Sequence, residues 1–181
     1  HRLFELCCVF GTIRRIQRSY GDLTLHRVEP GMGEVARLES DKYRIEVYYD
    51  QIGPLRFAEP LPSVAELQDR GADERFIRLA RAGEKHQEAM ATFLDQSSER
   101  LLYSGRPDVL VLRYERHESE DEQLTDCVIG EAKYTESEAT FSAGVRELLE
   151  YVAFAQNESE YVDDSAVEVT GVIYTDGVET T

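Results

Sequence analysis

The sequence has 181 residues and lacks several features that would assign it to a broad class. It contains no apolar run near the roughly 18–20 residues that a membrane-spanning helix requires, so we expect no membrane association and a cytoplasmic location. Its three cysteines include no CxxC pair, and no two of its histidines share a helical spacing, which argues against a zinc site. The odd number of cysteines favours a reducing compartment.

No signal peptide is recognisable, and residue 1 is His rather than Met, so we expect a fragment of a longer chain. The length is that of one domain, and a hydrophobic content of 41% argues against disorder. We therefore predict a single domain over residues 1–181.

Basic residues are also scarce, and the formal net charge of −16 differs from the basic surface that a generic nucleic-acid binder shows. Only three of the basic residues are lysines (Lys42, Lys85 and Lys133), against 17 arginines. An acidic, lysine-poor composition resembles that of proteins from salt-loving microbes, where salt screens charges over about 3 Å rather than about 10 Å. The acidic composition therefore indicates a salt-rich solvent rather than the charge of a binding partner.

The hydrophobic spacing predicts the order of the elements. Helices are expected over residues 2–18 and 140–156, and strands over 23–28, 42–50, 107–115, 125–134 and 167–174. Residues 51–62 hold three prolines and are expected to form a loop, and residues 117–126 an acidic loop. A helical insert is expected at about 63–97, with an inner stripe of Phe76, Ile77, Leu79, Ala80, Met90, Phe93 and Leu94.

The short loop between the strands at 107–115 and 125–134 predicts an antiparallel hairpin. The later strand–helix–strand step needs a crossover, which favours a parallel addition to the same sheet. The predicted fold class is α/β, with a mixed central sheet and helices on its faces.

The candidate chemistry lies on this hairpin. Asp108 opens the first strand, and Glu131 and Lys133 end the second. Residues at i and i+2 of a strand share a face, so Glu131 and Lys133 point the same way while Ala132 points into the packing. Asp108 begins opposite the end of the second strand, which predicts two carboxylates and an ammonium at one sheet edge.

Such a group suits metal-assisted hydrolysis of a phosphodiester. Two adjacent carboxylates repel unless a cation lies between them, and oxygen ligands suit Mg²⁺ (or Mn²⁺), so Asp108 and Glu131 are the candidate metal ligands. The metal would acidify a bound water and offset charge on the phosphate. Lys133 would orient or deprotonate that water, a role for which arginine is a poor substitute.

These residues resemble the PD-(D/E)xK nuclease superfamily: Pro107-Asp108 matches the first motif and Glu131-Ala132-Lys133 the second. The resemblance covers most of the chain and implies a restriction-endonuclease-like core of helix, three strands, helix and strand, here with an insert between the first two core strands. It implies a Mg²⁺-dependent endonuclease that hydrolyses DNA, in restriction or defence against foreign DNA.

The resemblance also suggests supporting residues. The family often places an acid on the first helix, where this chain has Glu5, and many members have Gln and Tyr four apart on the helix after the second motif. This chain has Glu147 and Tyr151 there, so it departs from the pattern at Glu147. Similarity to the nuclease domain of McrC-like, methylation-dependent restriction subunits would add an AAA+ nucleotide-hydrolysing partner. Pairing of two nuclease domains makes a homodimer a further expectation.

Each of the candidate site residues also fits a structural role without catalysis. Asp108 is also a common turn residue at a strand start, and Glu131 with Lys133 also fits an exposed ion pair worth about 0.2–1 kcal/mol. Glu5 and Glu147 also fit solvated helix positions, and Tyr151 a core position with its hydroxyl on a polar group. The alternative function is a catalytically inactive nuclease-fold module for DNA binding or complex assembly.

The charge is unevenly distributed. Residues 117–181 hold 17 acidic and 2 basic residues, whereas residues 1–30 hold five arginines and three acids. Arg14, Arg15 and Arg18 lie on the polar side of the first helix, where phosphate contact competes with simple solvation. A DNA substrate is therefore not excluded, and we expect it to approach from the N-terminal half.

Overall fold

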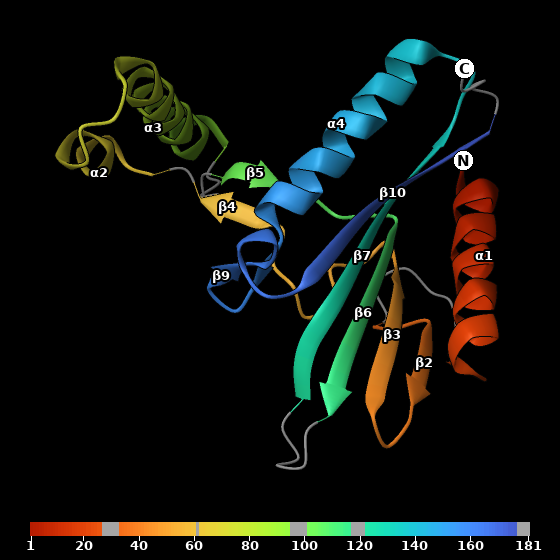
Figure 1. Ribbon diagram of the computed structural model, residues 1–181. Coiled ribbons are helices and arrows are strands. Elements are labelled where there is room, and N and C mark those ends of the chain that lie inside the picture. The colour runs from red at the N-terminus through yellow and green to blue at the C-terminus, as the bar shows by residue number, and fades with distance from the viewer. Residues whose placement is uncertain (27–32, 61, 95–100, 117–121, 177–181) are drawn as a thin grey trace. The chain divides into compact units, whose positions relative to one another are not determined.

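The computed structural model describes residues 1–26, 33–60, 62–94, 101–116 and 122–176. The chain forms two compact units, one of residues 1–57 with 105–181 and one of residues 58–104. The larger unit holds the strands β1 (Thr24–Leu25), β2 (Ala36–Glu39), β3 (Tyr43–Tyr49), β6 (Val109–Arg116), β7 (Glu122–Tyr134) and β10 (Glu168–Asp176). They form one sheet in the order β1-β2-β3-β6-β7-β10 (Figure 1).

The sheet is mixed, as the sequence predicts. Each neighbouring pair from β1 to β7 is antiparallel, which confirms the hairpin of β6 and β7. β10 joins β7 in parallel, which confirms the crossover. The coarse class is therefore α/β with a six-stranded mixed sheet.

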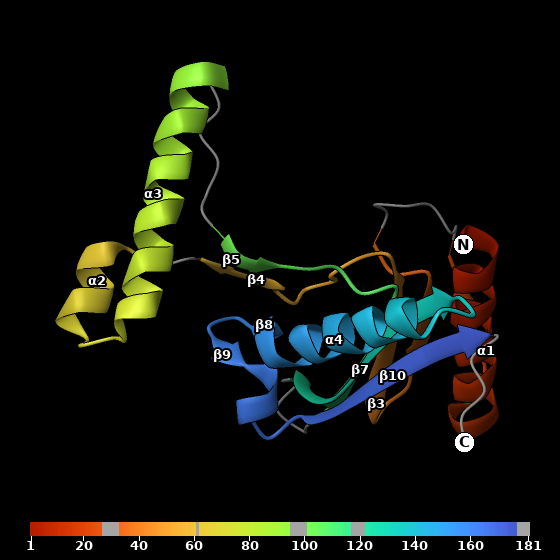
Figure 2. The same cartoon turned by 90° about the horizontal axis from the view of Figure 1, so that it is seen from above.

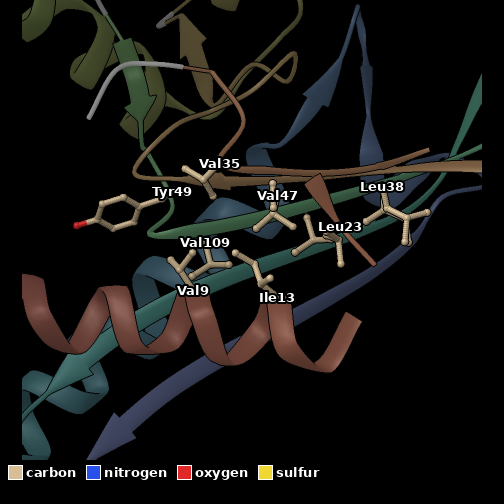
Figure 3. Packing of buried hydrophobic residues seen from close by; sticks show 11 residues of the cluster. Val9, Ile13, Leu23, Val35, Leu38, Val47, Tyr49 and Val109 are labelled. Carbon is tan, nitrogen blue, oxygen red and sulfur yellow. The ribbon is translucent and has the colours of Figure 1, made fainter. Parts of the chain in front are cut away.

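Two helices cover opposite faces of this sheet. α1 (Arg2–Tyr20) directs Val9 and Ile13 onto the core side chains of β3 and β6, among them Val47 and Val109 (Figure 3). α4 (Glu138–Phe154) runs along β7 and β10 (Figure 2). Two adjacent residues of β10 show which face each helix covers. Val172 lines a hollow together with residues of α1, whereas Gly171 lies against Leu148 of α4. Alternation along strands then assigns every sheet residue to one face.

The segment after α4 completes the larger unit with β8 (Gln156–Asn157), β9 (Glu160–Tyr161) and a short 3₁₀ helix, η1 (Val162–Asp164). β8 and β9 pair with each other, and Gln156 also bridges to Arg56. In the described part of the chain, no helix is long and apolar enough to cross a membrane.

The smaller unit is the predicted insert, but it is larger than residues 63–97. Two strands, β4 (Ala58–Pro60) and β5 (Leu101–Ser104), pair antiparallel and frame the helices α2 (Val64–Asp69) and α3 (Glu74–Leu94). α2 begins at a capping box in which Ser63 and Glu66 bond each other's backbone N–H, which explains its start. β4 falls where the sequence predicts only loop, so that prediction was wrong for three residues.

The predicted inner stripe of the insert is only partly correct. Ile77 and Ala80 are buried, but Phe76, Leu79 and Phe93 are 59%, 51% and 80% exposed. Residues 95–97 and the side chains of Met90 and Leu94 lie outside the described part. The Gly105 N–H donates to the Phe57 carbonyl oxygen at 2.8 Å, which joins the chain of the larger unit at the two points where residues 58–104 leave and return.

Two strands differ from the sequence prediction: β7 begins earlier than predicted, and β2 was not predicted at all. β7 begins at Glu122, inside the expected acidic loop, because Arg116 pairs with Glu122 and Arg113 with Asp126, each at 2.8 Å across the hairpin. Residues 117–121 lie outside the described part. β2 was not predicted, since four residues give too little alternation. On α4, Leu148 is buried, whereas the neighbouring Leu149 is 62% exposed.

Replacing Gly130 by alanine is expected to destabilise the larger unit. A Cβ there would lie 2.7 Å from Cε2 of Tyr174 and 3.0 Å from Cβ of Val109, so the core would be overpacked at a cost of about 1–3 kcal/mol. Urea unfolding of Gly130→Ala measures this cost, with Gly171→Ala as the control, because its nearest atoms are at an ordinary 3.5 Å. Equal stability of the two variants would contradict the packing described here.

Candidate active site

Asp108 and Glu131 face each other at one end of the hairpin. Val109 pairs with Gly130, so the antiparallel register places the next residues, Asp108 and Glu131, opposite one another. The Ala132 N–H donates to Oδ2 of Asp108 at 2.8 Å, and the Asp50 N–H donates to the Asp108 carbonyl oxygen at 3.1 Å. Both strands neighbouring β6 thus hold Asp108 in place, as the sequence predicts for the hairpin.

Lys133 lies between two carboxylates. Its Nζ is 2.5 Å from Oε1 of Glu131 and 2.7 Å from Oε2 of Glu147, which comes from α4. Glu131 is buried on the same face as Lys133, and Ala132 is buried on the other, as the alternation predicts. The structure therefore brings Glu147 to the site, although the sequence left its role open.

The second carboxylate oxygen of Glu131, Oε2, is buried. Among the residues that the structure describes, it has no hydrogen-bond partner. The pKa of Glu131 is raised to about 7, mainly by burial and also by the negative charge of Asp108, while the hydrogen bond from Lys133 opposes the rise. An ionised carboxylate at this position thus lacks part of the stabilisation that it would have in water.

Asp108 experiences a similar environment. Burial raises its pKa, the Ala132 N–H opposes the rise, and the charges of Glu5 and Asp50 add to it. Lys133 remains protonated: burial lowers its pKa, but hydrogen bonds to Glu131 and Glu147 outweigh burial, so the net shift is upward. The same bond from Lys133 is the main reason that the pKa of Glu147 is lowered. The site therefore has an excess of negative charge with one internal counter-ion.

Glu5 borders this group from α1. Its Oε2 accepts a hydrogen bond of 2.9 Å from the Tyr49 hydroxyl at the end of β3. Its charge contributes to the raised pKa of Asp108. Glu5 is therefore a fixed, half-buried acid rather than a freely solvated one, although no contact joins it to Glu131 or Lys133.

Tyr151 supports the strand that carries Asp108. Its hydroxyl forms a hydrogen bond with the backbone of Arg106, and its ring packs edge-on against Phe57 at 6.2 Å. Burial raises its pKa, and the charges of Glu131, Glu147 and Asp108 contribute. Tyr151 thus behaves as the sequence predicts for a core tyrosine with a polar partner, one turn of α4 after Glu147.

Three residues near the site were not singled out from the sequence. Asp50 has a left-handed backbone with φ 51°. Its Oδ1 forms an ion pair with Nε of the exposed Arg106 at 2.8 Å. Gly144 on α4 lies directly against the Lys133 side chain. The strand-terminal position of Asp50 and the glycine inside a helical pattern were the available signals.

The side chains that could hold a cation at this site are two carboxylates. No three His, Cys, Asp or Glu side chains converge on one point among the residues that the structure describes. What the site offers is the pair Asp108 and Glu131, with the unpartnered buried oxygen of Glu131. Mg²⁺ is commonly bound by one or two carboxylates and retains several waters, and the pair Asp108 and Glu131 has that number of carboxylates.

Comparisons of the chain with protein-family models, with curated proteins and with solved structures found no match. The fold and the site define the chain as a mixed α/β protein in which a buried Glu131 and a half-buried Lys133 and Glu147 form a charged group at one end of the hairpin.

Proposed function

We propose that the chain is a Mg²⁺-dependent endonuclease that hydrolyses DNA phosphodiester bonds with a PD-(D/E)xK-type core. The order α1, β3, β6, β7, α4 and β10 matches the order of helix, three strands, helix and strand that the sequence motifs imply. Residues 58–104 form the insert between its first two core strands.

One observation carries the proposal: Glu131, which the register sets opposite Asp108, has a buried carboxylate oxygen with no hydrogen-bond partner among the described residues. If Glu131 served only in a structural ion pair, we would expect both of its carboxylate oxygens to accept hydrogen bonds, because a buried charge without hydrogen bonds is costly. A cation between the two carboxylates would remove this cost.

The roles of the residues follow from their positions. Asp108 and Glu131 would hold Mg²⁺ or Mn²⁺, which would supply an acidified water and offset charge on the scissile phosphate. Lys133, protonated between Glu131 and Glu147, places a positive charge beside the carboxylates where the phosphate would lie. Glu147 keeps the ammonium oriented, and Glu5 adds negative charge on the α1 side.

The surface charge suggests how the substrate approaches. Arg14, Arg15 and Arg18 are exposed on α1, whereas the C-terminal third is strongly acidic. DNA would contact these arginines through its phosphates, and high salt would screen repulsion from the acidic segment. A role in restriction, with an AAA+ partner and a second copy of the domain, extends the same proposal.

The test uses supercoiled plasmid DNA at about 1 M salt, where screening is strongest. We expect nicking with Mg²⁺ or Mn²⁺ and none in EDTA, together with a rise in melting temperature on adding either cation. A chain that neither cuts DNA nor gains stability from Mg²⁺ and Mn²⁺ would contradict the proposal.

A second function, a binding or assembly module without catalysis, has one observation in its favour. Lys133 already neutralises Glu131 from one side, and the described residues offer no three-ligand metal group. Under this alternative the cation would not change the melting temperature, and DNA would be bound without being cut.

A further inference from the structure

Gly144 occupies the interior of α4, between its N-cap at Ser137 and its last residue, Phe154. Glycine destabilises a helix interior relative to alanine. Gly144 is also buried, so neither a turn nor a surface position accounts for it. A local contact is therefore needed to explain why a glycine is found at this position.

The reason is the side chain of Lys133. A Cβ on residue 144 would lie 2.5 Å from Cγ, 2.8 Å from Cε and 3.1 Å from Cδ of Lys133. These three nearest atoms all belong to one side chain, and none belongs to the backbone of β7. The space beside Gly144 is thus filled by the aliphatic part of Lys133.

The path across Gly144 determines where the ammonium ends. Lys133 starts on β7 and crosses α4 beside Gly144, and its Nζ then reaches both Glu131 and Glu147. Because Cγ is the atom closest to the added Cβ, the clash falls near the root of the side chain. The whole chain of Lys133 would have to move, and its tip would move with it.

We propose that Gly144 is a positioning residue for Lys133: the missing side chain leaves a groove in α4 that guides the ammonium to its place between Glu131 and Glu147. The effect on cleavage rests on the proposed nuclease function, whereas the effect on Lys133 itself does not. Any β-carbon at residue 144 displaces Lys133 without changing a charge.

The first experiment measures melting temperature in a double-mutant cycle. Gly144→Ala is made in the natural chain and in Lys133→Ala, and Gly11→Ala in α1 is the matched control, since nothing lies within 4 Å of its added Cβ. We expect Gly11→Ala to raise the melting temperature by about 2–4 °C in both backgrounds, from helix propensity. Gly144→Ala should give this gain only when Lys133 is alanine.

The second experiment follows the ε-methylene signals of the lysines by NMR. The chain has only three lysines, and Lys42 and Lys85 are exposed, so the Lys133 signal is distinguishable. We expect a contact between its side chain and the Gly144 α-protons in the natural chain. In Gly144→Ala the Lys133 signal should shift, whereas in Gly11→Ala it should stay unchanged.

The third experiment compares cleavage under single-turnover conditions. Gly144→Ala is expected to cut plasmid DNA about 10²-fold more slowly with unchanged DNA affinity, the effect of a misplacement of about 1 Å. Equal gains in melting temperature in both backgrounds, with an unchanged Lys133 signal, would overturn the inference. If the natural chain cuts no DNA, the nuclease proposal fails, but the cycle and the NMR signal still decide the role of Gly144.

Discussion

The Glu131→Gln variant is expected to lose Mg²⁺-dependent cleavage by at least about 10²–10³-fold and yet to be more stable than the natural chain in EDTA. Glutamine keeps the size of the side chain but removes the charge that a cation would bind. Burial, together with the charge of Asp108, raises the pKa of Glu131 to about 7, so the folded protein favours the uncharged form. We expect a gain of about 1–3 kcal/mol at about pH 8.

The pH dependence of stability follows from the same shift. The folded-state pKa of Glu131 lies above its unfolded value of 4.5, so the folded chain binds the extra proton between these two values. The contribution of Glu131 to the free energy of unfolding is therefore full below about pH 4.5 and is lost as the pH rises through about 7. Urea unfolding across this range should show the loss in the natural chain and not in Glu131→Gln.

Glu160→Gln, at an exposed position of β9, is the matched control for both measurements. It should leave cleavage unchanged and should lack the stability gain of Glu131→Gln. Cleavage by Glu131→Gln at the natural rate would remove Glu131 from the metal site. A loss of stability relative to Glu160→Gln would show instead that the ion pair with Lys133 is the main role of this carboxylate.

The Lys133→Met variant is expected to cut DNA about 10²–10⁴-fold more slowly while binding Mg²⁺ or Mn²⁺ more tightly. Methionine retains much of the aliphatic part beside Gly144 but removes the ammonium, which is the only positive side chain in contact with Glu131 among the described residues. Without this counter-ion, the negative charges of Glu131 and Glu147 attract a cation more strongly. Cleavage and cation affinity should therefore change in opposite directions.

Single-turnover cleavage and calorimetric cation titration measure the two effects separately. Lys42→Met is the control, because Lys42 is exposed and distant in sequence from the motifs. Lys133→Arg should not restore cleavage, since the planar guanidinium cannot replace the compact ammonium that contacts both Glu131 and Glu147. Weaker cation binding by Lys133→Met would contradict competition between Lys133 and the metal.

The sequence predicts the hairpin site well because two local rules determine it. Alternation puts Glu131 and Lys133 on one face, and antiparallel pairing puts Asp108 opposite Glu131. Both rules act over adjacent strands, so they need no knowledge of the rest of the fold. The helix α1 and the parallel strand β10 were predictable for a similar reason, since their apolar periodicity is long.

The contacts that complete the site were not predictable in this way. Whether Glu147 meets Lys133 depends on how α4 packs against β7, where the Lys133 side chain lies beside Gly144. The first three residues of β7, 122–124, were missed because Glu122 fits an acidic loop in the sequence, whereas in the structure it pairs with Arg116 across the hairpin. Hydropathy alone contains neither kind of information.

The hydrogen bond between Gly105 and Phe57 has a consequence for how such a chain can diversify. It joins the two ends of the larger unit where residues 58–104 leave and return, so the pairing of β3 with β6 does not depend on what lies between them. Residues 58–104 can therefore change in length or sequence while the register that sets Asp108 opposite Glu131 stays the same.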